Sequence, residues 1–148
     1  MLRQFLLGCL LPLTAAASWT RFTSGPFEVM SSAGTKDGRD TLVRFEEFRH
    51  ALGLVLGDDN LQTPQPVRIL LFKTGAPQTP EPIVHGRDQY AIVLTAGKPI
   101  APEVFARLTQ LFLDTNSARM PERLERGLVE LFSTIEVTGI RITLGRPP

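Results

Sequence analysis

Short stretches in which hydrophobic and polar residues alternate predict several β-strands, because successive side chains of a strand point to opposite faces of the sheet. The first two strands are expected at Trp19–Phe22 and Phe27–Ser31. The turn-forming residues 24–26 separate them, which indicates two neighbouring strands at the start of the domain.

Two apolar runs predict strands in the middle of a sheet. Val67–Phe72 is rich in branched side chains, the pattern of a central strand buried on both faces, and Tyr90–Thr95 predicts the next strand. Between them, residues 74–88 hold three prolines and two glycines and are expected to form a surface excursion rather than an element. Near the C-terminus, Ile140–Leu144 alternates again and is expected to form a hairpin with Ile135–Val137.

Hydrophobic residues spaced three and four apart predict three helices. The longest is expected from about Asp37 to Leu56, with Thr35 or Asp37 capping its first turn and Gly57 in the left-handed position just past its end. Two shorter helices, Pro102–Asn116 and Pro121–Thr134, each begin with a proline, whose missing amide costs no hydrogen bond there.

The order of these elements indicates the fold class. A strand, a long helix and a further strand in succession suggest a crossover unit, and the apolar faces of the two shorter helices suggest an antiparallel pair packed on the sheet. We therefore predict an α+β domain with a small mixed or antiparallel sheet, on which a long helix and a helix pair are packed.

The first 17 residues predict a signal peptide rather than a part of the fold. They hold one basic residue, Arg3, then an apolar core, and end in small residues, which predicts cleavage after Ala17. The apolar run is far shorter than the roughly 20 residues of a membrane span. The chain is therefore expected to be exported, to the periplasm or outside the cell. Residues 18–148 are then expected to form one domain without a stable membrane span.

Removal of this segment balances the charge and removes the thiol. The whole chain carries 16 basic and 15 acidic residues and one cysteine, so loss of Arg3 and Cys9 leaves 15 of each charge and no cysteine. A balanced charge without a basic cluster gives no reason to expect nucleic-acid or membrane-surface binding. Without cysteine, disulfide scaffolds and thiol catalysis are excluded.

The two shorter helices carry a family resemblance. The residues that carry it are Leu111, Leu113, Asn116, Pro121, Leu124, Gly127, Leu128, Glu130, Phe132, Ser133 and Thr134. They resemble the active-site helix pair of a peptidase-MA-like, gluzincin-type zinc metallopeptidase domain. In that family a helix with the motif H-E-x-x-H is followed by a proline-led helix that supplies an acidic ligand. The pattern Phe45, Glu46, Phe48 and Arg49 in the long helix extends the resemblance. Relatives in this family are often fused to tetratricopeptide repeats, and the Pro147-Pro148 end directly after a predicted strand suggests a truncated or short gene product.

The positions that would carry the chemistry depart from the family. Ala106, Arg107 and Gln110 stand where the first histidine, the glutamate and the second histidine belong, and Arg126 replaces the acidic ligand. Glu130 remains, but a single carboxylate does not hold zinc. The resemblance therefore implies the fold without the peptidase activity, and no metal or cofactor is expected.

Two further pairings follow from these positions. Arg107 and Glu130 are a candidate ion pair in place of the metal. Glu122, Arg126 and Glu130 are spaced four apart, which favours an ion-pair ladder along the surface of the helix.

Other candidate sites are weaker. Glu46 and His50 lie one helical turn apart and either touch a metal or form a surface pair, while His85 lies in the proline-rich excursion. The acidic loop at residues 57–62 is not an EF-hand, because Thr63 and Ile69 occupy the positions that need Gly and Glu.

We therefore expect an inactive, metallopeptidase-like domain that serves as a binding or scaffolding module for a protein partner. Two alternatives stay open: a hydrolase with an unrecognised active site in the same cleft, using Glu130 or His50, and a purely structural domain of a larger cell-envelope repeat protein.

Overall fold

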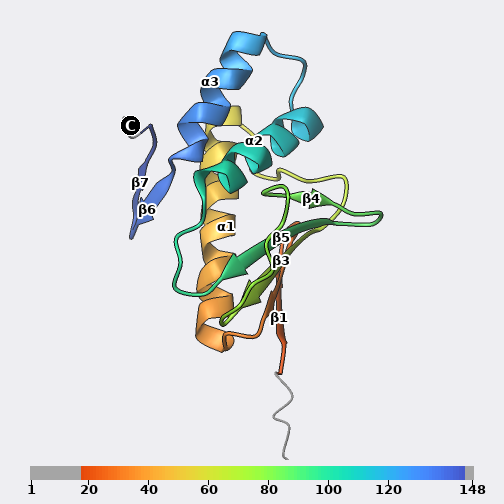
Figure 1. The fold of residues 1–148 in the computed structure, drawn as a ribbon. Helices are drawn as coiled ribbons and strands as arrows, with labels where there is room; N and C mark the ends of the chain where they lie inside the picture. Colours follow the sequence, from red (N-terminus) through yellow and green to blue (C-terminus); the bar gives the residue numbers. More distant parts are fainter. Residues whose placement is uncertain (1–17, 146–148) are drawn as a thin grey trace, which may run out of the picture.

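The computed structural model describes residues 18–145, so the predicted signal peptide at residues 1–17, with its cleavage after Ala17, lies outside the described residues. The elements are β1 (Thr20–Ser24), β2 (Phe27–Ser31), α1 (Thr35–Leu56), β3 (Val67–Phe72), β4 (Val84–His85), β5 (Tyr90–Thr95), α2 (Pro102–Asn116), α3 (Glu122–Ser133), β6 (Glu136–Thr138) and β7 (Arg141–Thr143). Figure 1 shows their arrangement.

Five strands form one mixed sheet in the order β1-β2-β3-β5-β4. The three central strands run parallel, and β1 and β4 pair antiparallel with the strands beside them, one at each edge. A separate hairpin joins β6 to β7. The predicted α+β class is confirmed, as is the crossover unit, because α1 connects the parallel strands β2 and β3.

The helices cover one face of the sheet (Figure 1). On that inner face the central strands present fully buried side chains, aligned across the sheet by the register that pairs Val29 with Ile69 and Ile69 with Ile92. Since burial of one such side chain contributes about 1.5–3 kcal/mol, this layer supplies much of the favourable free energy of folding.

A cluster of phenylalanines joins the sheet to all three helices. Its members are Phe27 of β2, Phe45 and Phe48 of α1, Phe105 and Phe112 of α2 and Phe132 of α3. Each is at most 8% exposed, and neighbouring ring centroids lie 5.2–6.2 Å apart, within the range of favourable aromatic pairs. One ring, Phe48, contacts rings of both α2 and α3 and so connects three helices.

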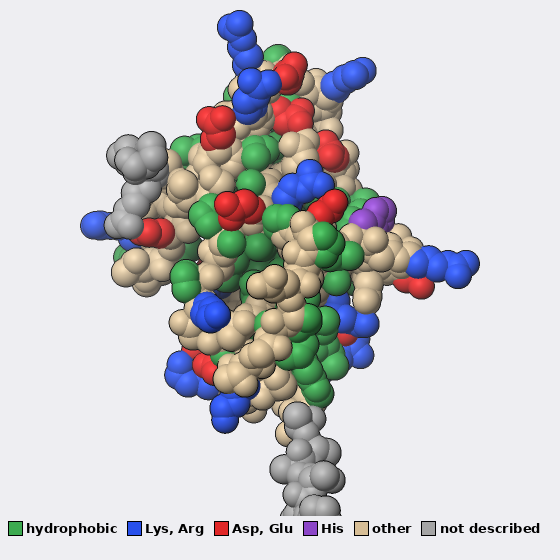
Figure 2. Space-filling model, viewed as in Figure 1, with side chains coloured by type: hydrophobic (Ala, Val, Ile, Leu, Met, Phe, Trp, Pro, Cys, Tyr) green, Lys and Arg blue, Asp and Glu red, His purple; other side chains and the backbone are tan. Residues whose placement is uncertain are grey.

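The prediction that Val67–Phe72 is buried on both faces of the sheet is wrong. Residues of β3 are alternately buried and half-buried, because no helix of the described residues covers the opposite face (Figure 1). On this outer face Glu28 is nevertheless buried, because Arg21 and Arg68 on the neighbouring strands each approach its carboxylate to 3.0 Å. Trp19 packs edge-on against Phe72 at 5.1 Å on the same face. Figure 2 shows hydrophobic side chains gathered at the lower right, over the strands.

Two local predictions also change. The excursion at residues 74–88 is not wholly irregular, since β4 lies inside it and pairs with β5. The helix predicted to begin near Asp37 begins at Thr35, with Gly34 at the capping position and no side-chain cap. Its other end is as predicted, because Gly57 adopts a left-handed φ of 71°.

Two helical glycines make a matched test of the packing. A Cβ on Gly38 would lie 2.5 Å from Cε2 of Phe22 and 2.9 Å from Cβ of Ser31, whereas a Cβ on the exposed Gly127 would meet nothing within 4 Å. We expect Gly38→Ala to lower the free energy of unfolding by about 1–2 kcal/mol, because overpacking outweighs the gain in helix propensity. We expect Gly127→Ala to raise it by about 0.5–1 kcal/mol. Urea denaturation measures both, and equal stabilisation by the two changes would contradict the packing of α1 on β1.

Candidate functional site

Helix α2 carries two different faces. Its inner face buries Val104, Phe105, Leu108 and Phe112 against the core. Its first residue, Pro102, is preceded by Ala101 in extended conformation, so the helix begins where the predicted start placed it. Arg107, Gln110 and Asp114 follow one another at helical spacing and line a cavity on another side of the helix.

This cavity, of about 170 Å³, lies between α2 and the strand edge formed by β4 and β5. Glu81, Ile83, His85 and Tyr90 line its sheet side, and Arg107, Gln110, Leu111 and Asp114 line its helix side. The rings of His85 and Tyr90 stack with centroids 4.9 Å apart, which fixes one wall. Two of the predicted site positions, Arg107 and Gln110, thus reach a common cavity.

The side chain of Gln110 is held by two carboxylates. Its Nε2 donates a short hydrogen bond to Oε1 of Glu125 on α3 and a second one, of 3.2 Å, to Oδ1 of Asp114 on its own helix. The residue of α3 that reaches Gln110 is therefore Glu125, the neighbour of the position that the resemblance assigns to the acidic ligand.

The remaining predicted positions lie elsewhere. Ala106 is half-buried within α2. Arg126 is exposed and its guanidinium lies 2.5 Å from Glu122, which forms the first step of the predicted ladder. Glu130 is exposed too, and among residues 18–145 no ion pair joins it to Arg126 or to Arg107. The structure thus brings Arg107 and Gln110 to one cavity and leaves Arg126 and Glu130 on the surface of α3.

The donor atoms present do not fit a zinc ion. Zinc in a peptidase needs three nitrogen, sulfur or carboxylate ligands, but these positions offer a methyl group, a guanidinium and an amide. In the part of the chain that the structure describes, no three His, Cys, Asp or Glu side chains are grouped as a metal site requires.

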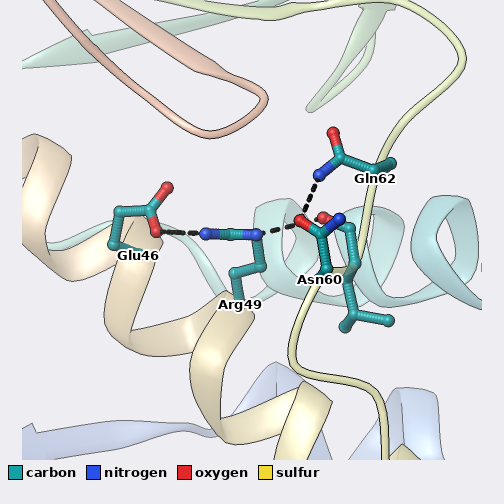
Figure 3. Close-up of polar contacts among 5 residues, drawn as sticks. Glu46, Arg49, Asn60 and Gln62 are labelled. Carbon is teal, nitrogen blue, oxygen red and sulfur yellow. Dashed lines mark hydrogen bonds and ion pairs between the residues drawn. The ribbon is translucent and has the colours of Figure 1, made fainter.

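Glu46 and His50, the other candidate pair, are not joined by a hydrogen bond or ion pair among the described residues, because Glu46 pairs with Arg49. Figure 3 shows Glu46 directed at Arg49, whose guanidinium donates to Oε2 of Glu46 at 2.7 and 3.2 Å. Arg49 also donates to the backbone oxygen of Leu61 at 3.2 Å, so the pair ties α1 to the segment that leads into β3. Oε1 of Glu46 is buried without a hydrogen-bond partner among the described residues.

Sequence reasoning missed two features near the site. The side chain of Asn116, at the end of α2, donates to the backbone oxygen of Gln62 at 2.8 Å and accepts from the backbone N–H of Gln62 at 2.9 Å. These two bonds hold the segment after α1 against α2. His85 belongs to the predicted excursion and Tyr90 to a predicted strand, and nothing in their spacing indicates that they line the same cavity as Gln110.

No family model, no curated protein and no solved structure matches this chain. No helix within residues 18–145 combines the length and the apolar character that crossing a membrane requires.

Introducing the ligands of the H-E-x-x-H motif tests whether positions 106, 107 and 110 correspond to that motif. We expect the unaltered chain to bind far less than one zinc per molecule, and the triple variant Ala106→His, Arg107→Glu, Gln110→His to bind one, with native Glu125 as the third protein ligand. Metal analysis after dialysis measures the stoichiometry, and competition with a chelator measures the affinity.

Two added changes make the test specific. Glu125→Gln in the triple variant should weaken zinc binding by at least about tenfold, because it removes a ligand, while Glu130→Gln should leave it unchanged. Stoichiometric zinc in the unaltered chain would contradict the expectation that it holds no metal. A triple variant that folds but binds no zinc would contradict the assignment of positions 106, 107 and 110.

Proposed function

We propose that this chain is an exported, catalytically inactive metallopeptidase-like domain that binds a protein partner at the cavity between α2 and β4. The observation that carries the proposal is the placement of Arg107 and Gln110. They line an intact cavity at positions where the family resemblance puts catalytic groups, and neither can do that chemistry.

The size and charge of the cavity favour a side chain of a partner over a metabolite. At about 170 Å³ it is smaller than the roughly 300–1,000 Å³ of most small-molecule sites. Its rim mixes the cationic Arg107 with the carboxylates of Glu81 and Asp114, which suits a polar side chain projecting from a polypeptide.

Peptide selection tests the binding role. A displayed library of extended heptapeptides is selected on the unaltered chain, and affinities are then compared among variants. We expect Arg107→Glu to weaken the binding of the selected peptides by at least about tenfold, because it replaces the arginine of the lining with a third carboxylate beside Glu81 and Asp114. The matched control Arg126→Glu, on the exposed side of α3, should leave the affinity unchanged.

Incubation of the same peptides with the chain, followed by mass spectrometry, tests inactivity. No cleavage product is expected, since the described residues offer no group of metal-ligating side chains and neither Arg107 nor Gln110 can act as a general base. Cleavage that Arg107→Glu abolishes would establish an enzyme instead. Peptides that bind Arg107→Glu as tightly as the unaltered chain would refute the cavity as the binding site.

Export has its own test. When the full sequence is expressed in a bacterium, we expect the protein outside the cytoplasm to begin at Ser18, the residue after the small-residue cleavage signal. Intact-mass measurement of the periplasmic and secreted fractions reads the start directly. A protein that keeps Met1 and stays in the cytoplasm would overturn the assignment.

A further inference from the structure

The two edges of the five-stranded sheet differ in how well they are protected from pairing. Edge strand β4 has only two residues and follows the prolines Pro80 and Pro82, which blunts that edge. Edge strand β1 has five residues, Thr20–Ser24, with no proline and with a regular register against β2 along its whole length. A regular edge of this kind is a template for another strand.

The alternation of the hairpin shows which groups of β1 face outward. Ser24 and Phe27 flank the two-residue turn and form a register pair. In such a hairpin the flanking pair is hydrogen-bonded, and so is every second pair after it. The backbone N–H and C=O groups of Arg21 and Thr23 therefore point away from β2, toward the free edge.

Beside this edge the structure has an apolar groove. Ser24 of β1 and Leu42, Val43, Glu46, Glu47 and His50 of α1 line a groove of about 370 Å³. Val43 is 46% exposed although it is a large hydrophobic residue. The open strand edge and the groove lie on the same flank of the molecule, so one partner can cover both.

We propose that two copies of this chain pair through β1 about a two-fold axis and join their sheets into one. An antiparallel pairing centred on Phe22 sets Arg21 of one copy opposite Thr23 of the other. The outward groups of both residues are then satisfied, and no like charges stand directly opposite. The isologous arrangement closes at two copies.

Helix α1 carries opposite charges that such a pairing brings together. Arg39 lies near its start, beside the Lys36–Asp40 ion pair, and Glu47 lies further along, beside the Glu46–Arg49 ion pair. A two-fold axis reverses the direction of the neighbouring α1, so Arg39 of one copy adjoins Glu47 of the other. The groove with Val43 lies between these two residues, where the second copy excludes water from it.

Sedimentation equilibrium tests the pairing with protein purified from cells that express the full sequence. We expect a mass of two chains at micromolar concentration. Thr23→Pro removes an outward-facing N–H, a change that an edge strand tolerates, and it should raise the dissociation constant by about tenfold or more. The matched change Thr23→Val keeps the N–H and should leave the dimer intact.

A second variant covers the case in which Thr23→Pro fails to fold by circular dichroism. Val43→Lys places a charge in the groove of each copy and should also shift the protein to the single-chain mass. Amide exchange adds a local readout: the amides of Arg21 and Thr23 should be protected in concentrated samples and should exchange rapidly in dilute ones.

Several results would overturn the dimer. The first is a single-chain mass at all concentrations up to about 1 mM, well above the micromolar range in which specific pairs form. The second is a mass above two chains, and the third is a folded Val43→Lys variant that remains dimeric. Because none of these measurements concerns the cavity beside α2, they are independent of the proposed function.

Discussion

The packing of six phenylalanine rings between the sheet and the helices is the interaction on which the rest of the structure depends. Phe27 of β2 contacts the rings of the cluster from the sheet, and Phe48 of α1 contacts rings of both α2 and α3. In a chain whose described domain contains no cysteine, this apolar contact takes the place that cross-links hold in many small exported domains. Loss of a buried ring of this kind typically costs about 3–5 kcal/mol, a large fraction of the stability of a domain of this size.

Much of the fold was predictable because its signals are local. The apolar period of Pro102–Asn116, the glycine after Leu56 and the alternation of the first hairpin each depend on neighbouring residues, and each element is present. Apart from the start of α1, the errors concern long-range packing. Burial on the outer face of β3 depends on whether a helix covers it, and β4 exists only because Val84 meets Ala91 of another strand.

The candidate site was predictable only in part, for the same reason. The helical spacing of Arg107 and Gln110 puts both on one side of α2, and the structure places both at one cavity. Which residue of α3 contacts Gln110 depends on the rotation of α3 about its axis. A family pattern indicated Arg126, whereas the contact is made by its neighbour Glu125, about 100° around the helix. The wall formed by His85 and Tyr90 comes from a distant segment and leaves no trace in the helical pattern.

The division of α2 into a phenylalanine side and a cavity side separates residues that stabilise the fold from residues that line the cavity. Substitutions at Phe105 or Phe112 disturb the contacts that keep the chain folded, so they lower its stability. Substitutions at Arg107 change the lining of the cavity while the rings beneath stay packed, so they leave the stability of the fold largely unchanged. The chemistry of the cavity side of this helix can therefore change by substitution while the chain keeps its fold.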